Sequence, residues 1–279
     1  MELGTHFQHW SASGEPLHFY GANGFPTGCY QELLSSLARN YAVSTLFNRA
    51  TWPHVSVPKK LHWQIYADDL IHFIETKIKQ PVIGVGHSMG ATATVFAAVK
   101  RPDLFSKLVL IEPAMTSPFL ANVLKVAPFK LKKRIQPIKF TVGKPSYWES
   151  KQAFYDDCRR RHVFKRINDH NLALLAEHSL VDDEENAYRL AFPKIWEAKN
   201  YATAPSLYKQ LGQLAMPTTA IRGKPSLYFS QKSWQTWQSV SPTSHFLEDK
   251  NYGHLMPLES PTDCLALIEQ GIDQMSLIK

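Results

Sequence analysis

Ser88 lies in the stretch VIGVGHSMGATATVFAA, residues 82–98, with Gly86 and Gly90 two residues away on either side. The apolar residues before it predict a short buried strand, and the small residues after it predict a helix. A chain that turns directly from strand to helix bends sharply, and small neighbours let the residue at the bend project outward. N–H groups at the start of the helix would stabilise negative charge there. The G-x-S-x-G spacing predicts a nucleophilic serine, the alternative being a glycine turn with an unreactive one.

A serine hydroxyl needs a base, and His254 is the strongest candidate among the twelve histidines. It lies in NYGHLMPLESP, after an expected strand and before the last expected helix, where Gly253 frees the backbone to present the ring. A surface histidine in a loop is the alternative interpretation. His87, next to the serine, is expected to pack or hydrogen-bond locally and to lie beside bound substrate.

Strands and helices alternate at both ends of the chain, which predicts an α/β fold with a mostly parallel central sheet and helices on both faces. We expect strands within residues 15–24, 41–48, 81–86, 106–114, 218–224 and 244–255, and helices within residues 28–40, 63–78, 91–105, 233–240 and 260–275. Residues 1–115 and 214–279 would form this core. Residues 116–213 are rich in Lys, Arg, Pro and aromatic residues without a convincing buried strand, which predicts an inserted helical cap.

Three motifs, GANGFP after an early strand, GHSMG at the bend and NYGHLMPLESP near the end, occur in this order. In them the chain resembles the α/β-hydrolase superfamily, in its serine-nucleophile, esterase- and lipase-like branch with a helical cap. The resemblance covers about residues 17–114 and 215–279. It implies that Ser88 is the nucleophile and that His254 is the base. No metal or other cofactor is expected.

The resemblance also implies an oxyanion hole built from two backbone N–H groups. One is that of Met89, directly after the serine, and the other is that of Phe25 in the loop after the early strand. Many relatives read His-Gly-Phe-Pro in this loop, whereas this chain has Asn23 in place of the histidine. We expect the amide of Asn23 to hold the loop by hydrogen bonds, as the imidazole would.

The acid of the catalytic set departs from the superfamily pattern. Relatives commonly carry an aspartate three residues after the glycine of the strand that here reads TTAIRG, and Ser226 stands at the matching position. Glu112, at the end of the apolar stretch KLVLIEP, is the best candidate, because burying a carboxylate is costly unless it is paired. Alternatively, Glu112 has a structural role where the chain enters the inserted segment, by accepting hydrogen bonds from backbone N–H groups. Asp249 is the alternative acid, and Ser226 could hydrogen-bond to the acid.

These residues predict a serine hydrolase that transfers acyl groups, acting on carboxylic esters with small or medium acyl chains. Thioester hydrolysis and carbon–carbon bond hydrolysis are alternatives within the same fold, and a catalytically silent small-molecule binding protein is the alternative outside enzymes. A surface-acting lipase that uses the basic cap on membranes is a further alternative. Substrate would contact Asn23, Phe25, His87 and Trp148, in a pocket walled by the aromatic and aliphatic side chains of the cap.

The composition and charge of the chain limit the kinds of binding partner that we expect. The formal charge is +7, concentrated in residues 124–140 and 159–161, and no nucleic-acid-binding motif accompanies it, so we expect no nucleic-acid partner. No run of about eighteen apolar residues exists, so stable membrane insertion is not expected. Three widely spaced cysteines and the absence of a secretory signal favour a cytoplasmic protein without a disulfide framework. The oligomeric state is left open.

Overall fold

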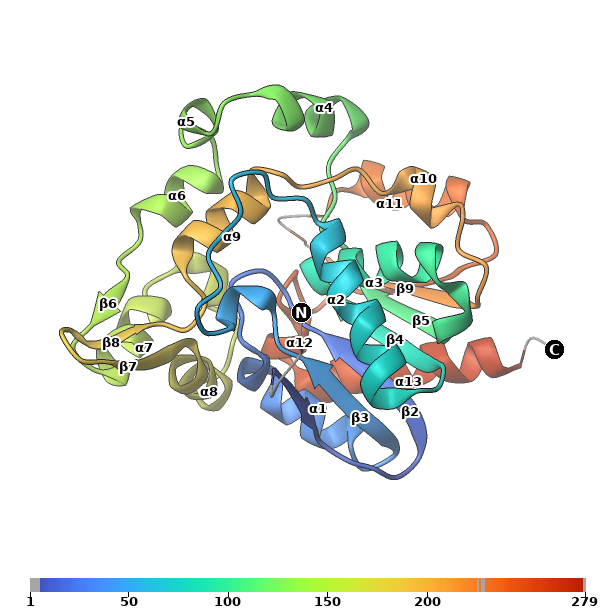
Figure 1. Cartoon of the computed structure of the whole chain (residues 1–279). Coiled ribbons are helices and arrows are strands. Elements are labelled where there is room, and N and C mark those ends of the chain that lie inside the picture. The colour runs from blue at the N-terminus through green and yellow to red at the C-terminus, as the bar shows by residue number, and fades with distance from the viewer. Residues whose placement is uncertain (1–5, 225, 227–228, 278–279) are drawn as a thin grey trace.

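The computed structural model describes residues 6–224, 226 and 229–277. Within these residues the main sheet has seven strands, in the order β1-β3-β2-β4-β5-β9-β10 (Figure 1). They are β1 (Phe7–His9), β2 (Glu15–Tyr20), β3 (Tyr41–Leu46), β4 (Val82–His87), β5 (Phe105–Ile111), β9 (Thr218–Gly223) and β10 (His245–Asp249). Only the pair of β1 and β3 among them is antiparallel. The expectation of a mostly parallel sheet is confirmed.

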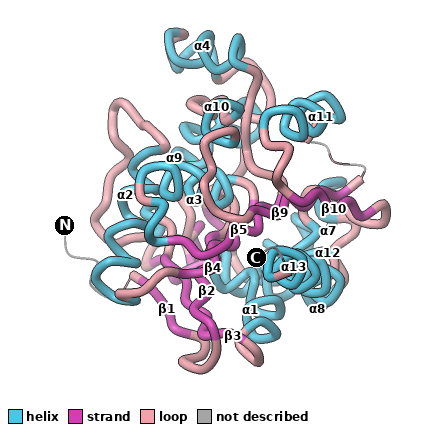
Figure 2. The backbone as a smooth tube through the Cα atoms, turned by 90° about the vertical axis from the view of Figure 1, so that its right-hand side faces the viewer, coloured by secondary structure: helices cyan, strands magenta, loops and turns pink. Residues whose placement is uncertain are grey.

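Helices cover both faces of this sheet (Figures 1 and 2). On one face pack α2 (Gln64–Phe73), α3 (Met89–Lys100) and α11 (Gln231–Val240), and on the other pack α1 (Gln31–Leu37) and α13 (Pro261–Ser276). A 3₁₀ turn, Thr27–Tyr30, leads into α1, and a π-helical turn, Ile74–Ile78, continues α2. The expected helices are therefore all present.

The strand β5 shows why the central strands are apolar throughout. Its alternate side chains point to opposite faces, so Leu108 and Leu110 join the core beneath α2 and α3, whereas Val109 and Ile111 join the core beneath α13. Because both faces are covered, neither set of positions tolerates polar residues. The sequence pattern does not predict β1, because this strand has only three residues and two of them, Gln8 and His9, are exposed.

The segment 116–213, inserted between β5 and β9, contains helices and a small antiparallel sheet. Its helices are α4 (Pro118–Val126), α5 (Phe129–Lys132), α6 (Ile138–Gly143), α7 (Lys151–Arg159), α8 (Asp169–Ser179), α9 (Lys194–Tyr201) and α10 (Tyr208–Leu211). Its strands, β6 (Tyr147–Trp148), β7 (Leu180–Asp183) and β8 (Ala187–Leu190), pair in the order β6-β8-β7. The sequence indicated no buried strand here, and the three strands found are short and mostly exposed. These strands are too short and too exposed to give an apolar run.

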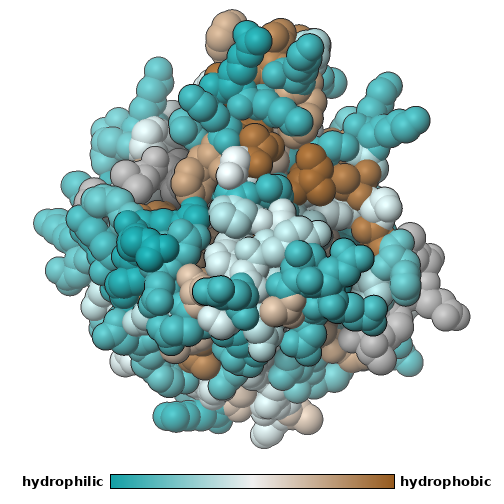
Figure 3. Space-filling view, turned by 90° about the vertical axis from the view of Figure 1, so that its left-hand side faces the viewer, coloured by the Kyte–Doolittle hydropathy of each residue, from teal (hydrophilic) through white to brown (hydrophobic). Residues whose placement is uncertain are grey.

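We propose that residues 116–213 form a cap over the C-terminal edge of the main sheet. Figure 1 shows α4 and α5 at the top of the molecule, above the strands. Figure 3 shows hydrophobic patches between long hydrophilic side chains at the same end. No helix in the described part of the chain combines the length and apolar character that a bilayer crossing requires.

Candidate active site

Ser88 occupies a strained bend between β4 and α3. Its φ of 54° and ψ of −115° lie in a region that residues other than glycine rarely adopt. The flanking glycines are required by space, because a Cβ on Gly86 would lie 2.4 Å from Ala91 Cα and one on Gly90 would lie 2.0 Å from the carbonyl oxygen of Tyr20. The bend that the sequence predicted is present.

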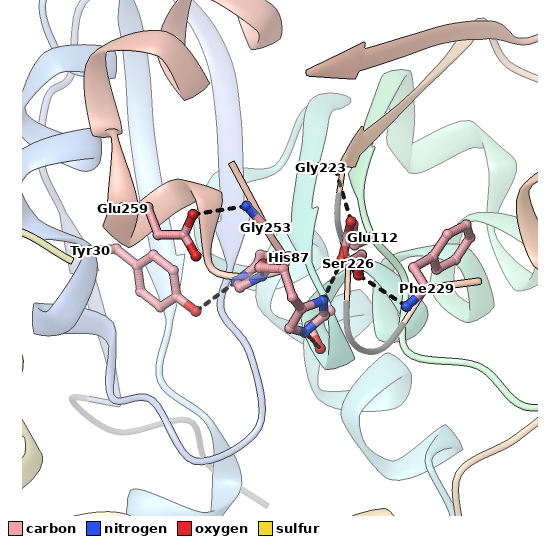
Figure 4. Close-up of polar contacts among 10 residues, drawn as sticks. Tyr30, His87, Glu112, Gly223, Ser226, Phe229, Gly253 and Glu259 are labelled. Carbon is pink, nitrogen blue, oxygen red and sulfur yellow. Dashed lines mark hydrogen bonds and ion pairs between the residues drawn. The ribbon is translucent and has the colours of Figure 1, made fainter. Parts of the chain in front are cut away.

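Three side chains from distant parts of the chain meet at this bend (Figure 4). His254 Nε2 lies 3.1 Å from Ser88 Oγ, and His254 Nδ1 lies 2.6 Å from Glu112 Oε2. Ser88 follows β4, Glu112 follows β5, and His254 follows β10 by five residues. Because these strands are parallel, their ends lie at one edge of the sheet, where ligands of open α/β sheets bind.

The carboxylate of Glu112 is buried, with 1% of the residue exposed, and is held from several directions. Oε1 accepts a hydrogen bond from the Gly223 N–H at 2.9 Å, and Oε2 accepts one from Ser226 Oγ at 2.7 Å. Ser226 in turn accepts from the Phe229 N–H at 3.0 Å. These donors offset part of the cost of burying the charge. The serine at the position where relatives carry the acid therefore donates to a carboxylate on the neighbouring strand.

Asp249, the alternative acid, is directed elsewhere. It is the last residue of β10, and its Oδ1 accepts a hydrogen bond from the Asn251 N–H at 2.7 Å. The residues after it form a loop that carries His254 to the carboxylate of Glu112. The geometry therefore favours Glu112 as the partner of the histidine.

His87 lines neither of the two cavities that contain Ser88, which corrects the expectation that it lies beside bound substrate. It is fully buried, because β4 is covered on both faces. Its Nδ1 accepts from Tyr30 Oη at 2.9 Å, and its Nε2–H donates to the His254 carbonyl at 2.8 Å. Burial, with a smaller contribution from His254, lowers the pKa of His87 to about 3, so the ring is neutral with one donor and one acceptor. His87 thus holds the backbone of His254.

Tyr30 extends this contact to the glycine-rich loop. Its Oη accepts from the Ala22 N–H at 2.9 Å while donating to His87. The loop before the histidine is fixed as well, because the Gly253 N–H donates to Glu259 Oε2 at 2.8 Å. Burial raises the pKa of Glu259. Figure 4 draws the contact of Tyr30 with His87 and that of Gly253 with Glu259. Together with the hydrogen bond from His87 to the His254 carbonyl, they hold His254 through its backbone from two sides.

The two expected oxyanion donors differ in their surroundings. Met89 is the first residue of α3, so its N–H belongs to the groups that a helix leaves without an intrahelical acceptor. The Phe25 N–H already donates to the Ala22 carbonyl, at 3.3 Å, across a turn in which Gly24 has a φ of 88°. If Phe25 is an oxyanion donor, its N–H must be shared between the Ala22 carbonyl and the substrate oxygen. The roles of Met89 and Phe25 as oxyanion donors stay predictions.

Asn23 holds its loop with both ends of its amide. Its Nδ2 donates to the Glu197 carbonyl at 3.1 Å, and its Oδ1 accepts from Asn200 Nδ2 at 2.8 Å. Asn200 Oδ1 accepts from Tyr66 Oη at 2.7 Å. The loop is thus fastened to α9 of the cap, which is the bracing that the sequence analysis expected of this amide.

Two cavities open from the serine. The first, of about 130 Å³, is lined by Ser88 and His254 and by three of the residues expected to contact substrate: Asn23, Phe25 and Trp148. The second, of about 260 Å³, shares Ser88 and His254. Its other walls are mainly apolar and include Met115, Leu120, Leu124, Ile135 and Ile138. A molecule bound at Ser88 could therefore extend in two directions.

Charged groups in the first cavity are already paired. Lys144 forms an ion pair with Glu197, and Arg161 Nη2 lies 2.5 Å from Asp157 Oδ2. No sequence motif indicates these pairs, because all four residues lie within residues 116–213, outside the three motifs. Among the described residues, no group of three or more His, Cys, Asp and Glu side chains is arranged to hold a metal ion.

Comparisons with known proteins agree with this architecture. The abhydrolase domain-containing protein ACTT2 of Alternaria alternata is 24% identical over 237 residues, covering 71% of this chain and 85% of that protein. The monoglyceride lipase of Rattus norvegicus is 36% identical over 80 residues, covering 27% of this chain and 26% of that protein. The crystal structure of an E-2-(acetamidomethylene)succinate hydrolase superposes with a TM-score of 0.80 at 20% identity, over 96% of this chain and 94% of that chain.

The family model that matches spans most of the sequence, from residue 17 to residue 267, and is described as the alpha/beta hydrolase family. Its match includes the bend at Ser88, the end of β5 and the loop of His254. The chain belongs to the alpha/beta hydrolase family.

Proposed function

We propose that this hydrolase acts by acyl transfer through Ser88, His254 and Glu112. The observation that carries the proposal is the continuous contact from Ser88 Oγ to His254 Nε2, 3.1 Å, and from His254 Nδ1 to Glu112 Oε2, 2.6 Å. In the first step Oγ attacks the substrate carbonyl while His254 takes its proton. Glu112 orients the imidazole and stabilises the imidazolium that forms.

The negative oxygen of the tetrahedral intermediate would lie between the Met89 N–H at the start of α3 and the Phe25 N–H in the loop after β2. His254 then donates its proton to the leaving group, which departs and leaves an acyl group on Ser88. Water then attacks the carbonyl carbon of the acyl group while His254 takes one of its protons. The bond between Ser88 Oγ and that carbon breaks, Oγ takes the proton from His254, and the acid product is released. One complete cycle returns Ser88 and His254 to the state in which they began.

We propose carboxylic esters with small or medium acyl chains as substrates. Support comes from the two cavities that meet at Ser88, because an ester has two arms on either side of its carbonyl carbon. The mainly apolar second cavity suits an aliphatic chain, and the first cavity, which includes the ion pairs of Lys144 and Arg161, suits the other arm. Thioesters have the same shape at the reacting carbon and belong in the same assay.

Labelling with a fluorophosphonate probe tests the nucleophile, and hydrolysis of p-nitrophenyl esters of short and medium chain tests the reaction. We expect the wild type to be labelled and active, and Ser88→Ala to lose both properties while keeping its far-UV circular dichroism. Thr92→Ser, a buried hydroxyl residue one turn along α3, serves as a matched control and should stay labelled. A folded wild type that neither reacts with the probe nor cleaves any ester or thioester would instead support a binding protein.

A further inference from the structure

Residues 118–140, which we call the cap arm, carry almost all of the net charge of the chain. The arm comprises α4, α5, α6 up to Phe140 and the turns between them. It has five lysines, one arginine and no acidic residue, so it contributes +6 of the formal +7. A charge so concentrated attracts anionic surfaces at long range.

The cap arm also exposes large apolar side chains. Phe119 is 78% exposed and Val126 is 81% exposed. Of eleven exposed large apolar side chains among the described residues, seven lie in this arm: Phe119, Leu120, Val123, Val126, Leu131, Ile135 and Phe140. Because Phe119, Val123 and Val126 follow helical spacing, they line one side of α4. Soluble surfaces rarely gather apolar groups in this way unless they meet a partner.

The basic side chains of the arm lack acidic partners. Neither Lys125, Lys130, Arg134 nor Lys139 forms an ion pair with any residue that the structure describes. Other cations of this protein, such as Arg101 and Lys144, are paired with carboxylates. The positive charge of the arm is therefore available to an external anion.

A basic hollow lies along the inner flank of the arm. It has a volume of about 760 Å³ and runs between the arm, the loop of residues 59–64 and the end of α9. Five lysines line it, and none of the described residues lining it is acidic: the lysines are Lys59, Lys60, Lys125, Lys132 and Lys199. A hollow of this composition suits phosphate-bearing headgroups beside the apolar side chains of α4.

The apolar side of the arm is continuous with the active site. Leu120 and Ile135 are 41% and 46% exposed, and both also line the second cavity, whose far end is Ser88. An aliphatic chain could therefore pass from the outer surface of the arm to the serine along apolar side chains. In Figure 3 the hydrophobic and hydrophilic atoms at the top of the molecule lie side by side, as an interface between lipid tails and headgroups requires.

We propose that the cap arm docks on anionic phospholipid membranes, with Phe119 and Val126 among the acyl chains and the lysines at the headgroups. Docking does not depend on catalysis. Delivery of a bilayer-dissolved ester along the second cavity rests on the proposed function. Binding would be peripheral and reversible, because one short helix buries little apolar area and its electrostatic part is screened by salt.

Vesicle co-sedimentation of the full chain as Ser88→Ala tests docking without turnover. The vesicles are phosphatidylcholine alone and phosphatidylcholine mixed in equal parts with phosphatidylglycerol. We expect binding to the mixed vesicles at low salt, little binding to pure phosphatidylcholine, and release at high salt.

Neutralising two lysines, Lys130→Gln with Lys133→Gln, should weaken binding about 25-fold, which corresponds to about 1 kcal/mol for each charge. Phe119→Ser with Val126→Ser should weaken it about tenfold or more.

Matched controls lie outside the arm. Leu277→Ser removes a side chain that is 83% exposed, and Lys165→Gln removes an exposed charge near α8, so both should bind as the parent does. None of the substituted arm residues lines a cavity that contains Ser88, so the same substitutions made in the protein that keeps Ser88 should leave hydrolysis of a dissolved short-chain ester unchanged. Hydrolysis of an ester embedded in mixed vesicles should fall in proportion to binding.

The docking proposal is overturned if the folded protein does not sediment with anionic vesicles at low salt, or if arm variants and controls bind equally. Sedimentation velocity tests the alternative occupant of the arm, a second copy of this chain. A dimer that Phe119→Ser with Val126→Ser converts to a monomer, without any vesicle binding, would make the arm a contact between two copies. Vesicle binding by a protein that never hydrolyses an ester would keep the docking surface and refute the proposed function.

Discussion

At the scale of single residues, the proposed acid, Glu112, follows β5 and not β9, the strand after which relatives commonly carry this residue. Glu112 adopts a φ of 42°, which is strained for a residue with a side chain. That conformation accompanies hydrogen bonds from Gly223 and Ser226 and the contact with His254. Strain of this kind persists only when the surroundings hold the residue firmly, and both carboxylate oxygens are so held.

Replacing Glu112 by Gln tests whether this carboxylate is the acid. The amide keeps the size of the side chain but carries no charge, so it can neither stabilise the imidazolium nor hold its tautomer. We expect kcat for ester hydrolysis to fall by about 10⁴-fold, as for removal of the charge of a triad acid, with little change in KM. Stopped-flow or steady-state assays with a p-nitrophenyl ester measure the loss.

The control for this substitution is Asp249→Asn, because Asp249 accepts only a local backbone hydrogen bond among the contacts found for its side chain. Its kcat should stay within a factor of about three of the wild type. If Asp249→Asn lost orders of magnitude and Glu112→Gln did not, the assignment of the acid would be reversed.

At the scale of elements, the turn from β4 to α3 depends on close contact between backbones. Gly90 lies against the Tyr20 carbonyl at the end of β2, where a Cβ would approach to 2.0 Å. α3 can therefore start beside the sheet only if its second residue has no side chain. The same contact brings the start of α3 close to the loop of Asn23 and Phe25.

Gly90→Ala should be strongly destabilising for this reason. The clash involves backbone atoms on both sides, which cannot rotate away, and we expect a loss of about 3 kcal/mol in the free energy of unfolding. Urea denaturation followed by fluorescence measures it. Gly143→Ala is the matched control, because a Cβ there meets nothing within 4 Å at the end of α6. That variant should be neutral or more stable by up to about 1 kcal/mol.

An equal loss in both variants would show that the cost comes from helix propensity or chain entropy rather than from the Tyr20 contact. A near-neutral Gly90→Ala would mean that α3 can move away from β2. In that case activity should be measured as well, since a shifted α3 displaces the Met89 N–H.

At the scale of the whole molecule, burial of two histidines couples folding to pH. His18, on β2, and His87, on β4, have no exposed surface. Desolvation lowers the pKa of each from 6.5 to about 3. Below about pH 6.5 the unfolded chain takes up protons that the folded chain refuses, so these groups make stability fall as pH falls, down to about pH 3.

We therefore expect the free energy of unfolding to decrease between pH 6.5 and 5 by about 1.4 kcal/mol per pH unit for each of these histidines. Urea denaturation at a series of pH values gives the slope. His18→Gln, whose amide oxygen can still accept from the Leu46 N–H, removes one titrating group and should lower the slope by about that amount. A stability that is constant between pH 7.5 and 5 would contradict the expectation, whatever the absolute stability of the variant.

Local patterns in the sequence determined the alternating elements, the bend at Ser88 and the candidates His254 and Glu112. They succeed because the spacing of glycines and the length of apolar runs act within a few residues. The short strands β6, β7 and β8 were missed since they bury few side chains. His87 packs and hydrogen-bonds locally as expected, but it does not lie beside the cavities at Ser88, because the sequence does not show which neighbour of a nucleophile faces a cavity.

Tertiary structure alone decided how these parts are joined. Three contacts show this: His254 Nδ1 meets Glu112, Ser226 donates to the same carboxylate, and His87 holds the His254 backbone. Each contact depends on strands that are more than a hundred residues apart in the sequence and meet at one sheet edge. The cap arm is a similar case. Its charges are visible in the sequence, but whether its apolar residues face a core or solvent depends on what packs against α4. Contacts between distant segments are set by packing of the whole chain, which no local pattern records.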